Sequence, residues 1–513
     1  MECWPLSEMT LAPAFTRDFR AQNIESLRRE TFDVLIIGGG INGAGIARDL
    51  TMRGAKVALI EQRHFASGTS GKNSQLIHGG LRYLKQLRVH LVRESLYERA
   101  TLLHLAPHLV TPQPFLMPMY GWPARLFYGT GLTLYDLLAG RGNVGRHRVL
   151  SAADVAKLEP GFALQGLTHG AIFYDCQVNS ARFVIENMWD AARLGATIVN
   201  YAHAKREGAV VSITDVLSGD TFPVRAAHVV DATGPWEPGL RLVRGSHIVI
   251  PRVNASENAV AYFEESGRII FVIPWGSARQ LSLVGTTDVD HSGGPDSVHI
   301  SAEETEYLLR IVRRLFPAAR DTEPISAFSS LRPLVPAAGS ATKASREHRI
   351  WKDDAGIVHV AGGKYTTYRV MSAEAADLIL PAESNTAATP LGGNTAESLN
   401  EWIASAPTLA SRHALTAAEA TVAIRHYGVQ TPNLLALLPE TAAPGLTRLE
   451  CAQIAFAVNH EMAERLADVM FVSTYWGYER KWTRENLTPV AREMARHIGW
   501  DTRRTEEEIS QIV

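Results

Sequence analysis

The chain has 513 residues, of which 46% are hydrophobic and 20% charged, and its formal net charge is −2. This ordinary globular usage provides enough apolar surface for two or three domains, and it argues against disorder and against nucleic acid as a partner. The three cysteines lie far apart and form no CxxC pair, so we expect neither a disulfide framework nor a zinc site.

The N-terminal segment, residues 1–30, predicts an extension with a short helix. Its acidic second residue and two early prolines are untypical of a signal peptide. Because the chain contains no uninterrupted apolar run of about 18 residues, we expect no membrane-spanning helix. We therefore expect a cytoplasmic protein, and peripheral attachment to the inner face of the cytoplasmic membrane stays open.

The region from 32 to 62 predicts a βαβ unit. The β-branched run FDVLII precedes the glycine-rich turn GGGINGAG, helical spacing continues to Gly54, and AKVALIEQ is typical of a second buried strand. Within the turn, Gly38, Gly40 and Gly43 satisfy the pattern G-x-G-x-x-G. The first glycine allows a tight turn, the second lets a pyrophosphate approach the backbone, and the third permits close packing of helix on strand.

Glu61 ends the second strand, where its carboxylate can accept hydrogen bonds from both ribose hydroxyls of a dinucleotide. The same charge would repel a 2′-phosphate, which disfavours NADP. A purely structural glycine turn is the alternative interpretation, but the strand–turn–helix context and Glu61 together favour a dinucleotide site. The motif alone leaves FAD and NAD open.

The middle of the chain predicts further elements. Residues 92–106 are typical of a helix that ends before Pro107. The proline-punctuated stretch 111–123 is not expected to form a regular central element. The aromatic and apolar stretch 124–140 fits either a membrane interface or a buried helix of a substrate domain, and 181–196 predicts an amphipathic helix.

The later part of the chain predicts a second sheet and a helical domain. Residues 226–236 predict a strand that runs into a Gly-Pro turn, 246–288 predict successive antiparallel strands, and 359–380 predict a strand, a glycine turn and a helix. The small, polar stretch 382–397 indicates a linker, and helical patterns follow it over 398–513. The turns DATGPW and AGGKYTTYR favour FAD over NAD, because the helix after the second turn could direct its positive N-terminus at a reduced flavin.

These motifs occur in an order that resembles a known family. The segments that carry the resemblance are IIGGGINGAGIARDL, SQLIHGGLRYL, FYDCQVNSARFV, DATGPW, RGSHIVIPR, FVIPW, GTTD, LRPL and GGKYTTYR. Together they resemble the FAD-dependent glycerol-3-phosphate dehydrogenase family, within the D-amino-acid-oxidase-like flavoproteins. The stretches AVNHEMAERLADV and WTRENL are similar to the family's C-terminal helical cap domain. The chain departs from the family at Gln75, where lysine is common, and at Lys72, an extra charge near the flavin.

The resemblance implies an α/β fold (α+β overall), in which a Rossmann-like FAD-binding domain is interleaved with an antiparallel-sheet substrate domain. A C-terminal helical cap domain follows at 398–513, and residues 1–30 precede the whole as an N-terminal extension. Within 31–380, the expected FAD-binding domain comprises about 31–95, 165–240 and 325–380, and the expected substrate domain comprises about 96–164 and 241–324.

The resemblance also implies the residues of an active site. Anchoring a phosphate dianion requires arginine and lysine, and histidine titrates near neutrality, where it can accept a hydroxyl proton. The predicted catalytic residues are His78, His247 and Arg332, and the predicted substrate-binding residues are Arg82, Tyr83, Lys364 and Thr366. The predicted cofactor-binding residues are Gly38, Gly40, Gly43, Glu61, Thr69, Ser70, Ser74, Gly79, Gly234, Gly363 and Thr367. The ordinary alternative is a structural ion pair for any single arginine, or a hydrogen-bonded core position for any single histidine. Asp288 is a candidate orienting partner.

The implied reaction is oxidation of sn-glycerol 3-phosphate to dihydroxyacetone phosphate by hydride transfer to FAD, with quinone or oxygen as the electron acceptor. A dehydrogenase of another polyol phosphate, such as erythritol phosphate, would use the same phosphate anchors. An amine or amino-acid oxidase is disfavoured because it needs a carboxylate anchor. A non-catalytic flavin-binding subunit is disfavoured because His78, Arg82, Arg332 and Lys364 are all present. No metal ion is expected, and a homodimer stays open.

Overall fold

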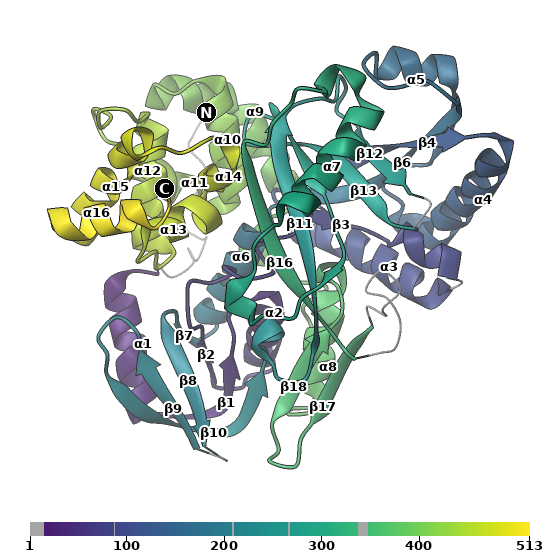
Figure 1. Cartoon of the computed structure of the whole chain (residues 1–513). Coiled ribbons are helices and arrows are strands. Elements are labelled where there is room, and N and C mark those ends of the chain that lie inside the picture. The colour runs from purple at the N-terminus through teal and green to yellow at the C-terminus, as the bar shows by residue number, and fades with distance from the viewer. Residues whose placement is uncertain (1–14, 87, 208–209, 265–266, 337–346) are drawn as a thin grey trace.

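The computed structural model describes residues 15–86, 88–207, 210–264, 267–336 and 347–513 of the chain (Figure 1). It contains two sheets and a helical C-terminal region, which confirms the predicted fold class. Each sheet carries one half of the candidate site, so their strand order decides which predicted residues meet.

The first sheet contains the predicted βαβ unit. Because parallel strands bring their carboxyl ends to one edge, the turns that follow β1, β2, β10 and β18 meet at that edge. Helix α2 (Ile41–Met52) is buried along nearly its whole length and packs against α6 (Ser180–Arg193) and α8 (Tyr368–Asp377). The strand path is β17 (His348–Lys352), β18 (Val358–Gly362), β10 (Thr221–Asp231), β1 (Thr31–Ile37), β2 (Val57–Ile60) and β7 (Thr197–Val199), with β9 (Val210–Asp215) and β8 (Ala202–Glu207) continuing from β10.

The second sheet is mainly antiparallel, as predicted for residues 246–288. Helix α7 (Ala302–Leu315) packs its buried leucines and valine against one face of this sheet. The strand path is β15 (Val289–Asp290), β11 (Arg241–Pro251), β14 (Leu281–Gly285), β13 (Ile269–Trp275), β12 (Ala259–Phe263), β4 (Val110–Tyr120), β6 (Leu167–Val178) and β3 (Leu76–Ile77), while β16 (Ser326–Leu334) pairs with β11 and β5 (Arg148–Ser151) pairs with β6.

Strand β4 corrects the expectation that 111–123 forms no regular central element. It runs between β12 and β6 and pairs with β6 along its whole length. Its prolines, Pro112, Pro114 and Pro118, occupy alternate positions, so the N–H groups that they lack all fall on one edge of the strand. The pairing of β4 with β12 is short and involves only Phe115 and Leu116. An edge of β4 that donates few hydrogen bonds is therefore tolerated there.

Two strands within the segments expected to form the FAD-binding domain belong to the second sheet. Strand β6 lies in the segment 165–240 and β16 lies in the segment 325–380, both assigned from the sequence to the FAD-binding domain. Both strands instead pair within the second sheet. Periodicity identifies a strand but does not say which sheet its neighbours belong to.

Helix α1 (Arg17–Arg29) and the predicted linker are each held by a buried arginine. Helix α1 is docked by Arg20, whose guanidinium lies 2.7 Å from the carboxylate of Asp215. The predicted linker at 382–397 is held by the buried side chain of Arg48, which donates to the carbonyl oxygens of Thr386 and Thr389. Figure 1 shows the C-terminal helices, coloured green to yellow, gathered on one side of the molecule.

The remaining helices confirm the predictions for 92–106 and 398–513. They are α3 (Val89–Leu105), α4 (Trp122–Ala139), α5 (Ala152–Leu158), α9 (Ala396–His413), α10 (Ala417–Tyr427), α11 (Thr431–Ala436), α12 (Arg448–His460), α13 (Leu466–Asp468), α14 (Trp476–Glu479), α15 (Arg484–Ile498) and α16 (Thr502–Ser510). Within the described residues, no helix has the length and apolar character needed to cross a membrane.

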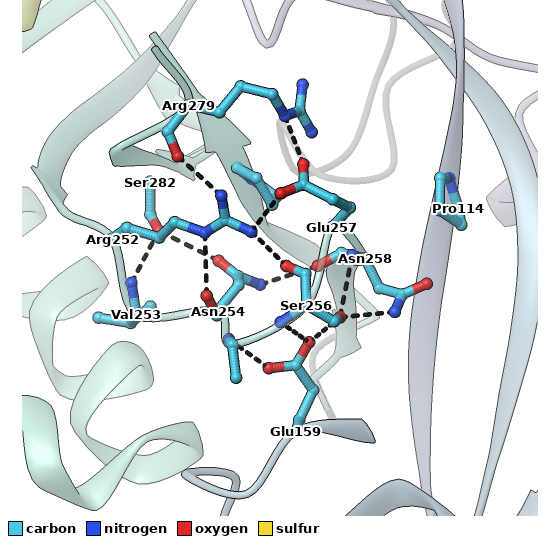
Figure 2. Close-up of polar contacts among 12 residues, drawn as sticks. Pro114, Glu159, Arg252, Val253, Asn254, Ser256, Glu257, Asn258, Arg279 and Ser282 are labelled. Carbon is cyan, nitrogen blue, oxygen red and sulfur yellow. Dashed lines mark hydrogen bonds and ion pairs between the residues drawn. The ribbon is translucent and has the colours of Figure 1, made fainter. Parts of the chain in front are cut away.

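A polar network holds the loop between β11 and β12 (Figure 2). Arg252 donates to the carbonyl oxygen of Arg279 at 2.8 Å and pairs with the carboxylate of Glu257 at 2.8 Å. The buried carboxylate of Glu159 accepts hydrogen bonds from the amide and the hydroxyl of Ser256. These residues lie outside the cavity described below, so the network stabilises the second sheet rather than the site.

Candidate active site

A cavity of about 600 Å³ lies where the two sheets meet. Its volume falls within the ~300–1,000 Å³ range of ligand sites. The lining includes the ends of strands in the first sheet, the loop 66–74, and side chains of β11 and β16 in the second sheet. The predicted residues that line it are Gly38, Gly40, Glu61, Thr69, Ser70, Ser74, His78, Tyr83, Gly234, His247, Arg332, Gly363 and Lys364.

The glycine turn between β1 and α2 forms one end of the cavity. Gly38 has a φ of +117°, and a Cβ built there would lie 2.5 Å from the carbonyl oxygen of Ala232 in the adjacent turn. A Cβ on Gly43 would lie 1.9 Å from the carbonyl oxygen of Gly38, so the turn closes only with glycine at both positions. The amide of Ile41, in the first turn of α2, donates to the Ser70 hydroxyl at 2.9 Å. The helix N-terminus and Ser70 therefore meet where a pyrophosphate would lie.

Glu61 is held in place at the end of β2 by backbone donors. Its carboxylate accepts hydrogen bonds from the amides of Gly39 at 2.6 Å and Arg63 at 2.8 Å. Burial raises the pKa of Glu61, and these two amides oppose the shift because they stabilise the charged form. The carboxylate lines the cavity beside the glycine turn, in the position that the ribose of a dinucleotide would require.

His247 lies on β11 at the opposite end of the cavity. Its Nε2 atom is 2.9 Å from the hydroxyl of Ser74, and its ring stacks on Phe328 with centroids 5.0 Å apart. Burial, and then the positive charge of Arg332, lower the pKa of His247 to about 3. The imidazole is therefore neutral near pH 7 and has a nitrogen able to accept a proton.

Arg332 projects from β16 into the same end of the cavity. Its guanidinium lies 3.1 Å from the carboxylate of Asp288, and it donates to the Thr286 hydroxyl at 2.9 Å and to the Thr287 carbonyl at 3.2 Å. The group rests on Gly245, where a Cβ would lie 2.3 Å from Nη1. Asp288 therefore has the orienting position expected for it, and Arg332 presents a fixed cation to the cavity.

Lys364 and Tyr83 form a second cationic corner. The ammonium of Lys364 donates to the Ser95 hydroxyl at 2.7 Å and lies 4.4 Å from the centroid of the Tyr83 ring. The backbone of Arg82 belongs to a 3₁₀ turn at Leu81–Gln86, but its side chain lies outside the described part of the chain. The substrate-binding role of Arg82 stays a prediction.

Four predicted residues lie behind the cavity wall rather than in it, namely Gly43, Gly79, Thr366 and Thr367. The Thr366 hydroxyl accepts a hydrogen bond from the amide of His78 at 3.2 Å, so it positions the candidate catalytic histidine. The Thr367 hydroxyl points back to the carbonyl of Lys364 at 3.5 Å. These residues support the site from outside, and their predicted contacts with cofactor or substrate stay predictions.

Gly79 faces protein rather than the cavity. A Cβ there would lie 2.3 Å from Leu96 and 2.4 Å from the Tyr135 hydroxyl. The Gly79 amide donates to that hydroxyl at 2.9 Å, and the hydroxyl donates to the carboxylate of Asp175 at 2.7 Å. Asp175 also accepts from the fully buried guanidinium of Arg99 at 2.7 Å.

Sequence reasoning missed the roles of Tyr135, Asp175 and Arg99. Asp175 lies within the quoted segment FYDCQVNSARFV, which was a signal for it. Tyr135 and Arg99 lie in stretches that carried no motif. The three side chains come from α4, β6 and α3 and fix the turn between His78 and Tyr83, which both line the cavity.

A parallel sheet with a dinucleotide turn, opening on a cavity with fixed cations and a neutral histidine, defines a dinucleotide-dependent oxidoreductase. The FAD dependent oxidoreductase family (DAO) matches residues 33–378, and the C-terminal domain of alpha-glycerophosphate oxidase matches residues 384–505. The chain belongs to the FAD-dependent oxidoreductase family.

Similarity to particular proteins narrows the class of oxidoreductase. An aerobic glycerol-3-phosphate dehydrogenase of Staphylococcus saprophyticus is 36% identical over 388 residues, which cover 70% of this chain and 69% of that protein. The fold is similar to that of the glycerol-3-phosphate dehydrogenase from Bacillus halodurans complexed with FAD, with a TM-score of 0.79, 26% identity and 96% of both chains covered. L-alpha-glycerophosphate oxidase from Mycoplasma pneumoniae with FAD bound shares the fold at a TM-score of 0.55 and 19% identity, over 68% of this chain and 95% of that one.

The residues present fit FAD. Gly40 is the N-cap of α2 and has no side chain to cap the first turn of the helix. Glu61 is held beside this turn by the amide of Gly39. The cavity then continues past Ser74 and Gly363 to His247 and Arg332. A dinucleotide held at the first end would extend its second half toward these residues.

Proposed function

We propose that the chain catalyses the FAD-dependent oxidation of sn-glycerol 3-phosphate to dihydroxyacetone phosphate. The observation that carries the proposal is a single cavity that joins the dinucleotide turn to Arg332, Lys364 and His247. FAD, when bound, supplies the acceptor for the hydride that leaves carbon 2 of the substrate.

Arg332 and Lys364 anchor the phosphate. A dianion pairs most strongly with donors that are already oriented, and Arg332 is held by Asp288 and by both Thr286 and Thr287. The fixed guanidinium leaves little rotational entropy to be lost when the phosphate binds.

His247 accepts the proton of the substrate's carbon-2 hydroxyl. Its imidazole is neutral before substrate binds, because burial and Arg332 hold its pKa near 3. A phosphate dianion on Arg332 offsets that repulsion and raises the pKa of His247, so the base becomes stronger only when substrate is present. Ser74 fixes the orientation of the ring.

The shape of the cavity favours a short polyol. A side cavity of about 80 Å³ shares His78, Tyr83, Phe271 and Thr286 with the main one. Its other walls are mainly apolar, with Phe173, Ala261, Phe263 and Ile269, and they also include Asp175 and Asp288. So small and mainly apolar a space offers few partners to the extra hydroxyls of a longer alditol, which disfavours erythritol phosphate.

Anaerobic mixing of the flavin-loaded protein with substrate tests this reaction. Glycerol 3-phosphate should bleach the flavin absorbance in a single turnover. Bleaching by erythritol phosphate alone would move the assignment to the longer substrate, and no bleaching by either ester would reject the dehydrogenase. His247→Asn should slow the reduction more than His78→Asn does, and the reverse order would make His78 the base.

We further propose that α4 attaches the protein peripherally to a membrane, where quinone rather than oxygen reoxidises the flavin. Within this helix only Leu132 and Tyr135 are buried. Figure 1 shows α4 at the outer edge of the molecule, where Leu126 and Leu137 are 75% and 73% exposed. An apolar face of this kind, flanked by arginine, suits an anionic lipid surface.

Co-flotation with vesicles of anionic lipid tests the attachment. The unchanged protein should float with the vesicles, and L126E/L137E should remain in solution. Leu194→Glu, at an exposed leucine after α6, is the matched control and should float normally. Equal flotation of all three proteins would reject α4 as the contact. Reduction of a soluble quinone without peroxide would support the acceptor, and stoichiometric peroxide in air would assign oxygen instead.

A further inference from the structure

Two carboxylates and an imidazole converge behind the wall of the cavity. Asp231 ends β10, Glu237 follows the turn at Gly234–Trp236, and His359 lies on β18, opposite Asp231 in the strand register. The exposed fractions of these residues are 6%, 9% and 5%. One ligand atom from each lies within 4.8 Å of the other two.

The imidazole is oriented as a metal ligand would be. Nε2 of His359 lies 3.0 Å from the carboxylate of Asp353 and forms a hydrogen bond with it. When Nε2 carries the proton, Nδ1 has its lone pair directed into the cluster, which is the usual outer partner arrangement of metal-binding histidines. Trp351 stacks on the ring at a centroid distance of 4.9 Å and restricts its rotation.

Glu237 interacts with both of the other groups, Asp231 and His359, and one of its oxygens has no partner among the described residues. Nδ1 of His359 lies 3.0 Å from Oε1 of Glu237. The other carboxylate oxygen, Oε2 of Glu237, is buried without a hydrogen-bond partner among the described residues. Asp231 uses one oxygen for the amide and hydroxyl of Thr233, and its other oxygen lies 3.4 Å from the guanidinium of Arg206.

The separations match ligands that share an ion. Bonds of about 2.1 Å from an ion to nitrogen and oxygen place neighbouring ligands of an octahedral ion ~3.0 Å apart, the separation of Nδ1 and Oε1 here. One imidazole with two carboxylates suits Zn²⁺ or Mn²⁺ better than Ca²⁺ or Mg²⁺, which prefer oxygen alone.

We propose that Asp231, Glu237 and His359 bind a divalent transition-metal ion. The ion ties the Gly234–Trp236 turn, which follows β10, to the neighbouring strand β18. Because Asp231 and Gly234 also line the cofactor cavity, the ion acts as a structural cross-link of that wall and takes no part in the redox step. No metal motif was visible in the sequence because His359 is more than a hundred residues from its partners.

The test uses the flavin-loaded protein with Zn²⁺ or Mn²⁺ alone as the ligand. After dialysis against a chelator, addition of either ion should raise the thermal unfolding midpoint by about 5 °C, because a ligand that binds only the folded state stabilises it. Elemental analysis after removal of excess metal should find about one ion per chain, as for a single structural site. His359→Gln and Glu237→Gln should each abolish both effects.

His348→Gln is the matched control. His348 lies on β17, which pairs with β18, and its Nε2 is 2.7 Å from the carboxylate of Glu374 on α8, so it forms a histidine–carboxylate pair outside the cluster. This variant should keep the metal-dependent shift. An unchanged midpoint with both ions, an equal shift in His359→Gln, or an equal shift with Mg²⁺ would each overturn the proposal.

Discussion

Replacing Arg332 with methionine isolates the contribution of the fixed cation. The substitution keeps an unbranched side chain above Gly245 but removes the charge from the cavity. A hydrogen bond to a charged group is worth about 1.5–3 kcal/mol, and loss of a two-pronged contact should therefore cost about 3–4 kcal/mol, or roughly 10²–10³-fold in kcat/KM. Arg332→Lys keeps the charge without the planar fork, so its kcat/KM should lie between those of the unchanged protein and Arg332→Met.

The same variant should alter the pH profile. Arg332 is the second cause, after burial, of the low pKa of His247. Removing a like charge favours the protonated imidazole, so the pKa of His247 should rise from about 3 toward its ordinary value. The acid limb of kcat/KM should accordingly move to higher pH. The acid limb moves in this direction because the base must be neutral to accept the hydroxyl proton.

Anaerobic stopped-flow reduction of the flavin measures both effects, and the absorbance spectrum reports whether FAD remains bound. Arg241→Met is the control, because Arg241 begins the paired strand β11 and forms an exposed ion pair with Asp290 at 2.7 Å. It should change kcat/KM little. An Arg332→Met protein with full FAD, unchanged kcat/KM and an unchanged acid limb would refute the assignment.

Three further predictions follow from the contacts around the cavity. Ser74→Ala should lower kcat by about tenfold while FAD stays bound, because a misaligned base slows proton transfer. Steady-state kinetics, with Ser67→Ala as the control, would measure this effect. An unchanged kcat would contradict the prediction. Tyr135→Phe should lower kcat/KM by about 5- to 30-fold, or about 1–2 kcal/mol, because the Gly79 amide loses one of its two acceptors and keeps only Asp175. Tyr97→Phe, at an exposed tyrosine, should not lower it, and equal kinetics of the two variants would show that the turn is held without Tyr135. The free energy of unfolding should fall as the pH drops from about 6.5 toward 3, because His247 binds a proton more readily in the unfolded protein than in the folded one. The unfolding midpoints of His247→Gln should lack this part of the pH dependence. An unaltered dependence would place the titrating group elsewhere.

Local patterns predicted the βαβ unit that carries the glycine turn. The run FDVLII, the glycine turn and Glu61 define a βαβ unit whose geometry depends on short-range sterics, and the structure confirms it. The prediction for 111–123 was wrong because the penalty for proline depends on which edge of a strand pairs.

Contacts between distant segments were beyond the reach of sequence patterns. The Gly79 amide meets Tyr135 and Asp175 only because α4 and β6 pack beside the turn, and no spacing in the chain encodes that approach. The pairing of His247 on β11 with Ser74 in the loop before β3 likewise joins residues that are 173 positions apart. Recognition of family motifs identified these two residues, but their mutual geometry required the fold.

The cavity wall is assembled from segments that span most of the chain, from Ile37 to Tyr365. The hydrogen bond between the amide of His78 and Thr366 alone bridges 288 residues. Such closures are made late in folding, because the entropy of a long loop must be lost before its contacts form. Free FAD therefore finds the complete site only on the finished protein, and it stabilises that state. A shortage of flavin in the cell would then appear as faster proteolysis of this chain as well as lower activity.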